Sequence, residues 1–163
     1  MIAKFSRCLP LLLAAFVPTL PVWGQQLTVR SDPQRAVVTA AQRPVLVYRV
    51  GDVPAKPYVE ELSTPAGINL LRDAPRDHVH HHGLMLGIRV DGVSFWHEGP
   101  GTGRQQHRGF ETQRAESRNG RSRAVLLESL QWLAPQADKP LLRESRLLEV
   151  RRADDLPATL LTW

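Results

Sequence analysis

The feature that most constrains the fold is the series of short apolar runs that follows Gly24. These runs are rich in β-branched residues, are cut by Pro, Gly and Asp, and keep no helical period, which is typical of short strands joined by turns. About ten such strands predict an all-β chain folded as an antiparallel β-sandwich or an open, curved pair of sheets. The expected strands are residues 27–30, 36–39, 45–50, 58–62, 68–71, 84–90, 93–96, 107–116, 121–132, 141–151 and 158–163.

Two-residue turns are expected between three pairs of these strands. Asp91-Gly92 separates two apolar runs, and such a pair favours a type I′ hairpin because both turn residues need a positive φ. Asn119-Gly120 and Asp154-Asp155 are expected to join the next two pairs. Residues 121–133 also fit an amphipathic helix in part, but the strands predicted on both sides favour a strand.

The first 24 residues have the features of a secretory signal peptide. Lys4 and Arg7 give a positive start, and the apolar run at 9–17 is too short for a bilayer span of roughly 20 residues. We expect cleavage after Gly24, export to the periplasm or the medium, and a mature chain of residues 25–163 with no stable membrane span. An uncleaved anchor is the alternative.

Composition removes several kinds of site from the mature chain. Cys8 is the only cysteine and lies in the leader, so we expect no disulfide and no thiolate ligand. Without Lys4 and Arg7 of the leader, 19 of the 21 basic residues remain against 16 acidic ones, and the arginines are scattered without interleaved aromatic rings, which argues against a nucleic-acid partner. The chain stops in an apolar run at 160–163, so we expect it to be the N-terminal part of a longer β-sandwich domain.

The histidines are concentrated in one short segment, because four of the six fall within residues 78–82. In an extended segment successive side chains face opposite sides. We therefore expect His78, His80 and His82 on one side and His81 on the other. Three imidazoles placed in this way are candidate ligands for a divalent metal ion such as zinc, copper, iron or nickel.

Three roles remain open for this segment. The first is the metal site just described, with Asp77 as an oxygen ligand or as the partner that orients a ring. The second is a metal-free site for proton transfer or substrate binding, since imidazole suits acid–base work near neutral pH. The third is purely structural. No common zinc motif such as His-Glu-x-x-His is present.

The predicted hairpin at Asp91-Gly92 adds further side chains to this region. It folds the chain back so that residues 96–98 are expected beside residues 84–86 and close to His82. A tryptophan ring in this place is suited to stacking on a sugar. The expected substrate-binding residues are Trp96, His82, His97 and Glu98. Weaker candidates are His107 and a carboxylate from either Glu111 or Glu116.

A series of motifs resembles a known family. The motifs are Lys56-Pro57-Tyr58, Leu-Ser-Thr-Pro-Ala-Gly at 62–67, Arg-Asp-Ala-Pro at 72–75, Asp-His-Val-His-His-His-Gly-Leu at 77–84 and Asp-Gly-Val-Ser-Phe-Trp at 91–96. Together they are similar to the signature of the PmoA-like family of exported bacterial proteins, over residues 45–115. His82 departs from that signature, because the family usually carries Arg at this position.

The resemblance implies a longer protein, a large β-sandwich similar to galactose-mutarotase-like folds and a setting of polysaccharide breakdown, although a fold does not fix a function. The leading hypothesis is an exported protein that acts on a small-molecule or oligosaccharide partner, a carbohydrate or glycoside. Its expected catalytic residues are His78, His80, His81 and Asp77. For an enzyme, lyase, epimerase or hydrolase chemistry is expected rather than oxidation. The alternatives are a non-catalytic sugar-binding module and a metal-dependent oxygenase, as the family's methane-oxygenase label implies.

Overall fold

The computed structural model describes residues 26–163, and every regular element in this range is a strand. This part of the chain contains no helix that is long and apolar enough to cross a membrane. The predicted leader, residues 1–24, lies outside the described residues. The strands are β1 (Leu27–Ser31), β2 (Arg35–Ala40), β3 (Arg43–Arg49), β4 (Tyr58–Leu62), β5 (Leu84–Met85), β6 (Arg89–Val90), β7 (Val93–Ser94), β8 (Arg104–Arg118), β9 (Arg121–Leu133), β10 (Pro140–Ala153) and β11 (Leu156–Thr162).

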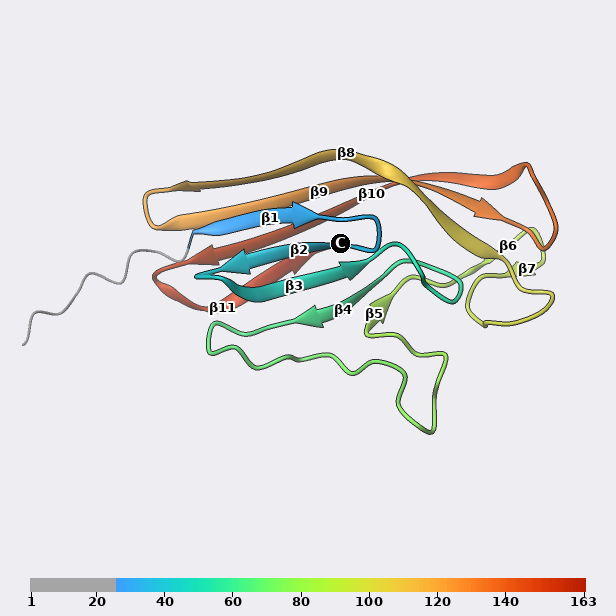
Figure 1. Ribbon diagram of the computed structural model, residues 1–163, viewed down its shortest axis with the longest axis horizontal. Coiled ribbons are helices and arrows are strands. Elements are labelled where there is room, and N and C mark those ends of the chain that lie inside the picture. Colours follow the sequence, from blue (N-terminus) through green and yellow to red (C-terminus); the bar gives the residue numbers. More distant parts are fainter. Residues whose placement is uncertain (1–25) are drawn as a thin grey trace, which may run out of the picture.

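Two antiparallel sheets form the body of the molecule (Figure 1). The first sheet has the order β1-β2-β3-β4-β5 and the second has the order β11-β10-β9-β8, so each strand pairs with its neighbour in sequence. The long strands β8, β9 and β10 lie over the first sheet, and β6 and β7 form a small separate hairpin at one end. The predicted all-β, antiparallel sandwich is confirmed.

The main core lies between the two sheets. Val38 and Leu46 from the first sheet pack in one buried cluster with Leu126 and Leu148 from the second. In β9 the side chains at even positions are buried, which is the period of two that a strand imposes, and Ala124 and Leu126 among them face this core. Burial of each leucine stabilises the folded chain by about 1.5–3 kcal/mol, so the contact between the sheets stabilises the fold.

A smaller apolar cluster fixes the hairpin against the second sheet. Phe95, which follows β7, is buried against Leu130 and Trp132 of β9, and its ring centroid is 4.8 Å from that of Trp132. A side chain at Gly103 would come within 2.4 Å of the Phe95 ring, so the chain passes directly over it. The residues after Phe95 are thereby held at the end of the sandwich where the hairpin lies.

Most of the predicted strands and turns are confirmed. Residues 58–62 form a strand with the predicted limits, and residues 121–133 form a strand rather than the alternative helix. Asp91 and Gly92 have φ values of 46° and 80°, as a type I′ turn requires. The turns at Asn119-Gly120 and Asp154-Asp155 connect β8 to β9 and β10 to β11.

Two predicted strands are wrong. Residues 68–71 make only an isolated bridge to the preceding segment, and Ile68 and Leu70 are exposed while Leu71 packs against the main core. Residues 84–90 are divided into β5, which pairs with β4, and β6, which pairs with β7. Between them, the amide of Phe95 still donates to the carbonyl of Ile88 at 2.9 Å, but residues 86–88 belong to neither strand.

Candidate functional site

The histidine segment is folded into turns rather than extended. The amide of His78 donates to the carbonyl of Pro75 (2.8 Å), and the amide of His81 donates to the carbonyl of His78 (2.9 Å). The period of two that applies to a strand therefore does not apply to these residues. The expected grouping of His78, His80 and His82 is not formed, because the ring of His82 lies against Tyr58 instead.

Four of the remaining histidines form a group near the surface that we call the imidazole cluster, made of His78, His80, His81, His97 and Trp96. His81 is at its centre. Its ring stacks on His78, with centroids 5.0 Å apart and planes 19° apart, and meets His80 edge-on at 4.6 Å and Trp96 edge-on at 5.3 Å. The ring of His97 lies 6.2 Å from that of His80. The hairpin thus brings Trp96 and His97 to the histidine segment.

The central imidazole of this cluster is biased toward its neutral form. Loss of hydration, followed by the positive charges of His80 and His78, lowers the pKa of His81 below its usual value of 6.5. Asp77 Oδ2 lies 3.0 Å from Nδ1 of His78, and both side chains are exposed. Asp77 can therefore orient the His78 ring, the role predicted for it, without closing the cluster to solvent.

The remaining histidine of the segment, His82, lies in a separate buried network. Its Nδ1 is 2.7 Å from Asp73 Oδ1, and its Nε2 is 3.3 Å from the carboxylate of Glu98. The His82 side chain is only 8% exposed. Because both ring nitrogens face carboxylates, His82 offers no free nitrogen to a substrate or a metal ion.

Two residues that sequence reasoning gave no role complete this network. Lys56 is 1% exposed and donates from Nζ to Glu98 Oε1 at 3.2 Å. Tyr58 lies with its ring 4.9 Å from that of His82 and donates its hydroxyl to Asp73 at 3.4 Å. Burial, followed by the charges of Asp73 and Glu60, raises the pKa of Tyr58 to about 12, so its proton stays in place.

The only earlier signal for these residues was their place in the motifs that carry the family resemblance. Lys56 and Tyr58 lie in the first motif, and Asp73 lies in the Arg-Asp-Ala-Pro motif. Nothing in their local pattern indicates that they meet a histidine. Glu98, expected at the substrate, instead bridges Lys56 and His82.

Gly83 allows the buried network and the imidazole cluster to lie side by side. It has a φ of 42°, and a Cβ atom at this position would lie 2.0 Å from the carbonyl oxygen of Val59 in β4. The backbone after His82 is thus pressed against the first sheet in a conformation that suits glycine. Any side chain at this position would push the histidine segment away from β4.

The described residues do not assemble a metal site. No group of three His, Cys, Asp or Glu side chains within residues 26–163 has a geometry that could hold a metal ion. His82 gives one reason, since both of its ring nitrogens already face carboxylates. The donor set expected at His78, His80 and His82 therefore does not fit a metal in this conformation.

A second buried polar network crosses the sandwich core and was not predicted. Glu128 is fully buried, accepts a hydrogen bond from the hydroxyl of Tyr48, and has its other oxygen 2.6 Å from Nδ1 of His107. The carboxylate beside His107 is therefore Glu128. The two carboxylates that were weaker candidates for the histidine site, Glu111 and Glu116, contact Ser129 and Arg123.

Arg146 extends this network along β10. It is almost fully buried and donates to both oxygens of Glu144 at 2.7 and 2.9 Å, to Gln105 at 2.7 Å and to Tyr48 at 3.0 Å. Its guanidinium also lies 5.0 Å from the centroid of the Trp163 ring. Every charge in this network has a partner, as burial requires, so we regard it as a structural link between the sheets.

Comparison with known proteins places the chain in a family but gives it no activity. No curated protein and no solved structure matches the chain. The predicted similarities to the PmoA-like family and to galactose-mutarotase-like folds therefore stay predictions. A family model does match residues 35–163, most of the chain, and the protein accordingly belongs to the family of unknown function DUF6807.

Proposed function

We propose that the imidazole cluster binds a carbohydrate and that His81 acts on it as a general base. The observation that carries this proposal is the pairing of an imidazole of lowered pKa with an indole that is 39% exposed. A base must be unprotonated before it can accept a proton, and His81 meets this condition at neutral pH. The exposed part of the Trp96 ring offers an apolar surface of the kind on which a sugar ring packs.

The proposed chemistry uses only side chains of the cluster. A substrate lying against Trp96 presents a hydroxyl or an acidic C–H group to His81, which accepts the proton. His78, held by Asp77, is the neighbouring group that returns a proton to the substrate. Lyase and epimerase reactions need this kind of transfer, and so do some hydrolyses.

His82 and its carboxylates act as positioning residues in this proposal. Because His82 directly follows His81 in the chain and is fixed by Asp73 and Glu98, it limits where the His81 ring can point. The buried ammonium of Lys56 holds Glu98 in turn. Such support is what a reacting group needs to stay within a productive geometry.

The experiment measures binding and conversion of a panel of neutral and uronate-containing oligosaccharides. His81→Gln is expected to lower turnover by about 10²–10⁴-fold while binding is retained, because general-base catalysis contributes on that scale. Trp96→Ala is expected to weaken binding. Arg76→Ala, on an exposed residue of the same loop, is the control that should change neither. The proposal is overturned if no saccharide binds, or if His81→Gln converts a bound saccharide at the normal rate.

A non-catalytic sugar-binding module is the second candidate. The open position of the imidazole cluster favours it, since Trp96, His78 and His97 all lie on the surface. In this case the panel reveals a saccharide that binds and loses affinity in Trp96→Ala, but no new reducing ends or altered sugars appear. Product analysis therefore separates the two functions directly.

We also propose that the protein is exported, because export would bring it to carbohydrate polymers outside the cell. The support is the charge and apolar pattern of residues 1–24 described above. Expression in a bacterial host followed by fractionation should recover the protein outside the cytoplasm. Sequencing of its N-terminus should begin at Gln25, and an intact Met1 in the recovered protein would contradict the cleavage.

A further inference from the structure

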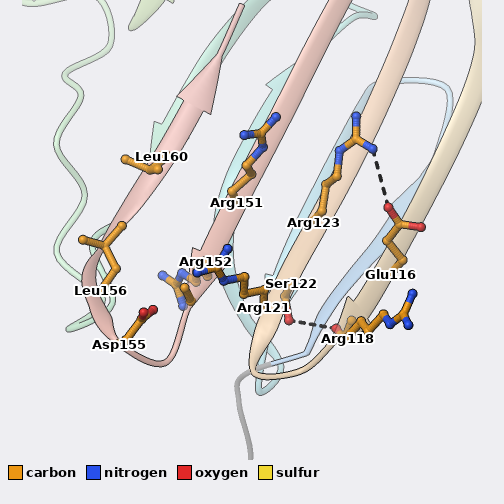
Figure 2. A pocket seen from close by; sticks show the side chains of 12 residues that line it. Glu116, Arg118, Arg121, Ser122, Arg123, Arg151, Arg152, Asp155, Leu156 and Leu160 are labelled. Atoms are coloured by element: carbon orange, nitrogen blue, oxygen red, sulfur yellow. Dashed lines mark hydrogen bonds and ion pairs between the residues drawn. The ribbon is translucent and has the colours of Figure 1, made fainter.

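A groove of about 860 Å³ opens near the turns that end β8 and β10. The β6–β7 hairpin, which carries Trp96 toward the imidazole cluster, lies at the other end of these long strands (Figure 1). Cavities of this size accommodate small-molecule ligands. Five arginines line the groove against two acidic residues, and Figure 2 shows that they come from β8, β9 and β10. The arginines are Arg118, Arg121, Arg123, Arg151 and Arg152, and the acidic residues are Glu116 and Asp155. Since guanidinium groups stay charged, the groove has a net positive charge.

The arginines include two pairs that lie directly opposite each other in neighbouring strands. Arg118 of β8 pairs with Arg121 of β9, and Arg123 of β9 pairs with Arg151 of β10. Like charges in directly opposite positions destabilise an antiparallel sheet. Each pair therefore needs a negative charge nearby to offset the repulsion between its two arginines.

The second pair has such a charge within the protein. Glu149 is 3% exposed, and its two oxygens are bound by Arg123 and Arg151. Arg123 also lies 3.5 Å from Glu116. The repulsion between these two arginines is offset by carboxylates of the chain itself.

The first pair has no such charge. Within residues 26–163, neither Arg118 nor Arg121 forms an ion pair, and both side chains are exposed at the groove. Among the described residues, the chain thus lines the groove with two arginines that form no ion pair with its own carboxylates. A ligand with negative charges supplies the counter-charge that the described residues do not provide for these two arginines.

We infer that this groove binds a ligand with two or more oxyanion groups, and that Arg118 and Arg121 are its main contacts. The paired N–H groups of a guanidinium can bind a carboxylate, a sulfate or a phosphate group, so all three are candidates for the oxyanion. Leu156 and Leu160 border the groove at 40% and 49% exposure and offer an apolar edge to the carbon skeleton of the ligand. No aromatic ring lines the groove, so it lacks the stacking surface that single-stranded nucleic acid uses.

The test is calorimetric titration with three probes that differ in their oxyanion: trigalacturonate, a disulfated disaccharide and inorganic tripolyphosphate. The double variant Arg118→Gln/Arg121→Gln is expected to weaken binding by about tenfold or more, since hydrogen bonds to charged groups are lost. The affinity of this variant for the probes should also depend less on salt concentration, because its groove carries less charge for salt to screen. The matched control is Arg114→Gln/Arg143→Gln, which removes the same charge from exposed positions of β8 and β10 outside the groove.

The outcomes separate a site from a general charge effect. The probe that binds most tightly identifies the oxyanion, and a loss confined to the groove variant supports the inference. Binding of none of the three probes overturns it, as does an equal loss in both double variants. Thermal unfolding checks that the groove variant folds, and its midpoint should not fall, because no ion pair is removed. The result does not depend on the function proposed for His81.

Discussion

At the scale of single residues, the protonation of His81 is the property on which the proposed chemistry depends. Its pKa is lowered by loss of hydration and by the charges of His80 and His78. In an NMR titration of the histidine rings, we expect the midpoint of His81 to lie below 6.5. In the variant His78→Gln/His80→Gln it should move up toward 6.5, because two like charges are removed. His107→Gln should leave it unchanged, and a midpoint above 6.5 in the unmodified protein contradicts the prediction.

Glu149 gives a second prediction for a single residue. Burial alone would raise its pKa, but hydrogen bonds from Arg123 and Arg151 outweigh burial, and the pKa lies below the usual 4.5. A depressed carboxylate pKa stabilises the fold at pH values above 4.5, and this stabilisation is lost as the pH falls through the folded-state pKa. The free energy of unfolding should therefore fall in acid.

Denaturant unfolding between pH 7 and pH 3 tests this dependence. Glu149→Gln should be less stable than the unmodified protein at pH 7 and should lose less stability on acidification. The control is Glu61→Gln on β4, since Glu61 forms no ion pair within the described part of the chain. It should follow the unmodified protein closely. Equal pH profiles for Glu149→Gln and the unmodified protein count against the role of Glu149.

At the scale of elements, Gly83 decides how the histidine segment joins the sheet. Gly83→Ala should destabilise the protein by about 2–4 kcal/mol, because the new methyl group meets the carbonyl of Val59 and adds strain at a positive φ. Gly92→Ala is the matched control. Gly92 also has a positive φ of 80°, but nothing lies within 4 Å of its Cβ position, so only the conformational cost of about 1 kcal/mol remains. Urea unfolding measures both, and equal losses would remove the steric argument.

The success of the sequence in predicting these elements depends on whether the pattern used reports a local property of the chain or the pairing of distant segments. The prediction succeeds for β4, where an apolar run ends at a turn signal, and for β9, where the strands predicted on both sides favour a strand. It fails at 68–71, where Ile68 and Leu70 are exposed in a loop, and at 84–90, where the two ends of the apolar run pair with different strands. The type I′ turn at Asp91-Gly92 is predictable because its chemistry is local.

The candidate site is less predictable than the elements because its contacts are distant in the chain. The gathering of Trp96 with the histidines follows from the hairpin and could be foreseen. The hairpin also predicts that Glu98 lies close to His82, and their contact at 3.3 Å confirms this. The other partner, Asp73, could not be foreseen, because no local pattern links it to His82. Likewise, Glu128 and Tyr48 are 80 residues apart in the sequence and are brought into contact by the packing of the two sheets.

At the scale of the whole molecule, the network around Glu128 ties the two sheets together. Tyr48 comes from β3 in the first sheet, while Glu128 and Arg146 come from β9 and β10 in the second. The hydroxyl of Tyr48 donates to Glu128 and accepts from Arg146, so it is the polar atom that joins the sheets at this point. All three side chains are buried.

Removal of this hydroxyl tests how much the link contributes to the fold. Tyr48→Phe keeps the ring but leaves a carboxylate and a guanidinium each short of one buried partner, which should cost about 1–3 kcal/mol of unfolding free energy. Tyr58→Phe is the control, since its hydroxyl makes one long bond of 3.4 Å to a partly exposed carboxylate and should cost less than about 1 kcal/mol. The urea midpoint should fall with an unchanged m value if the sheets still unfold together. A lower m value in Tyr48→Phe would instead mean that the sheets separate before the chain unfolds, and a midpoint equal to that of Tyr58→Phe would show that apolar packing alone joins them.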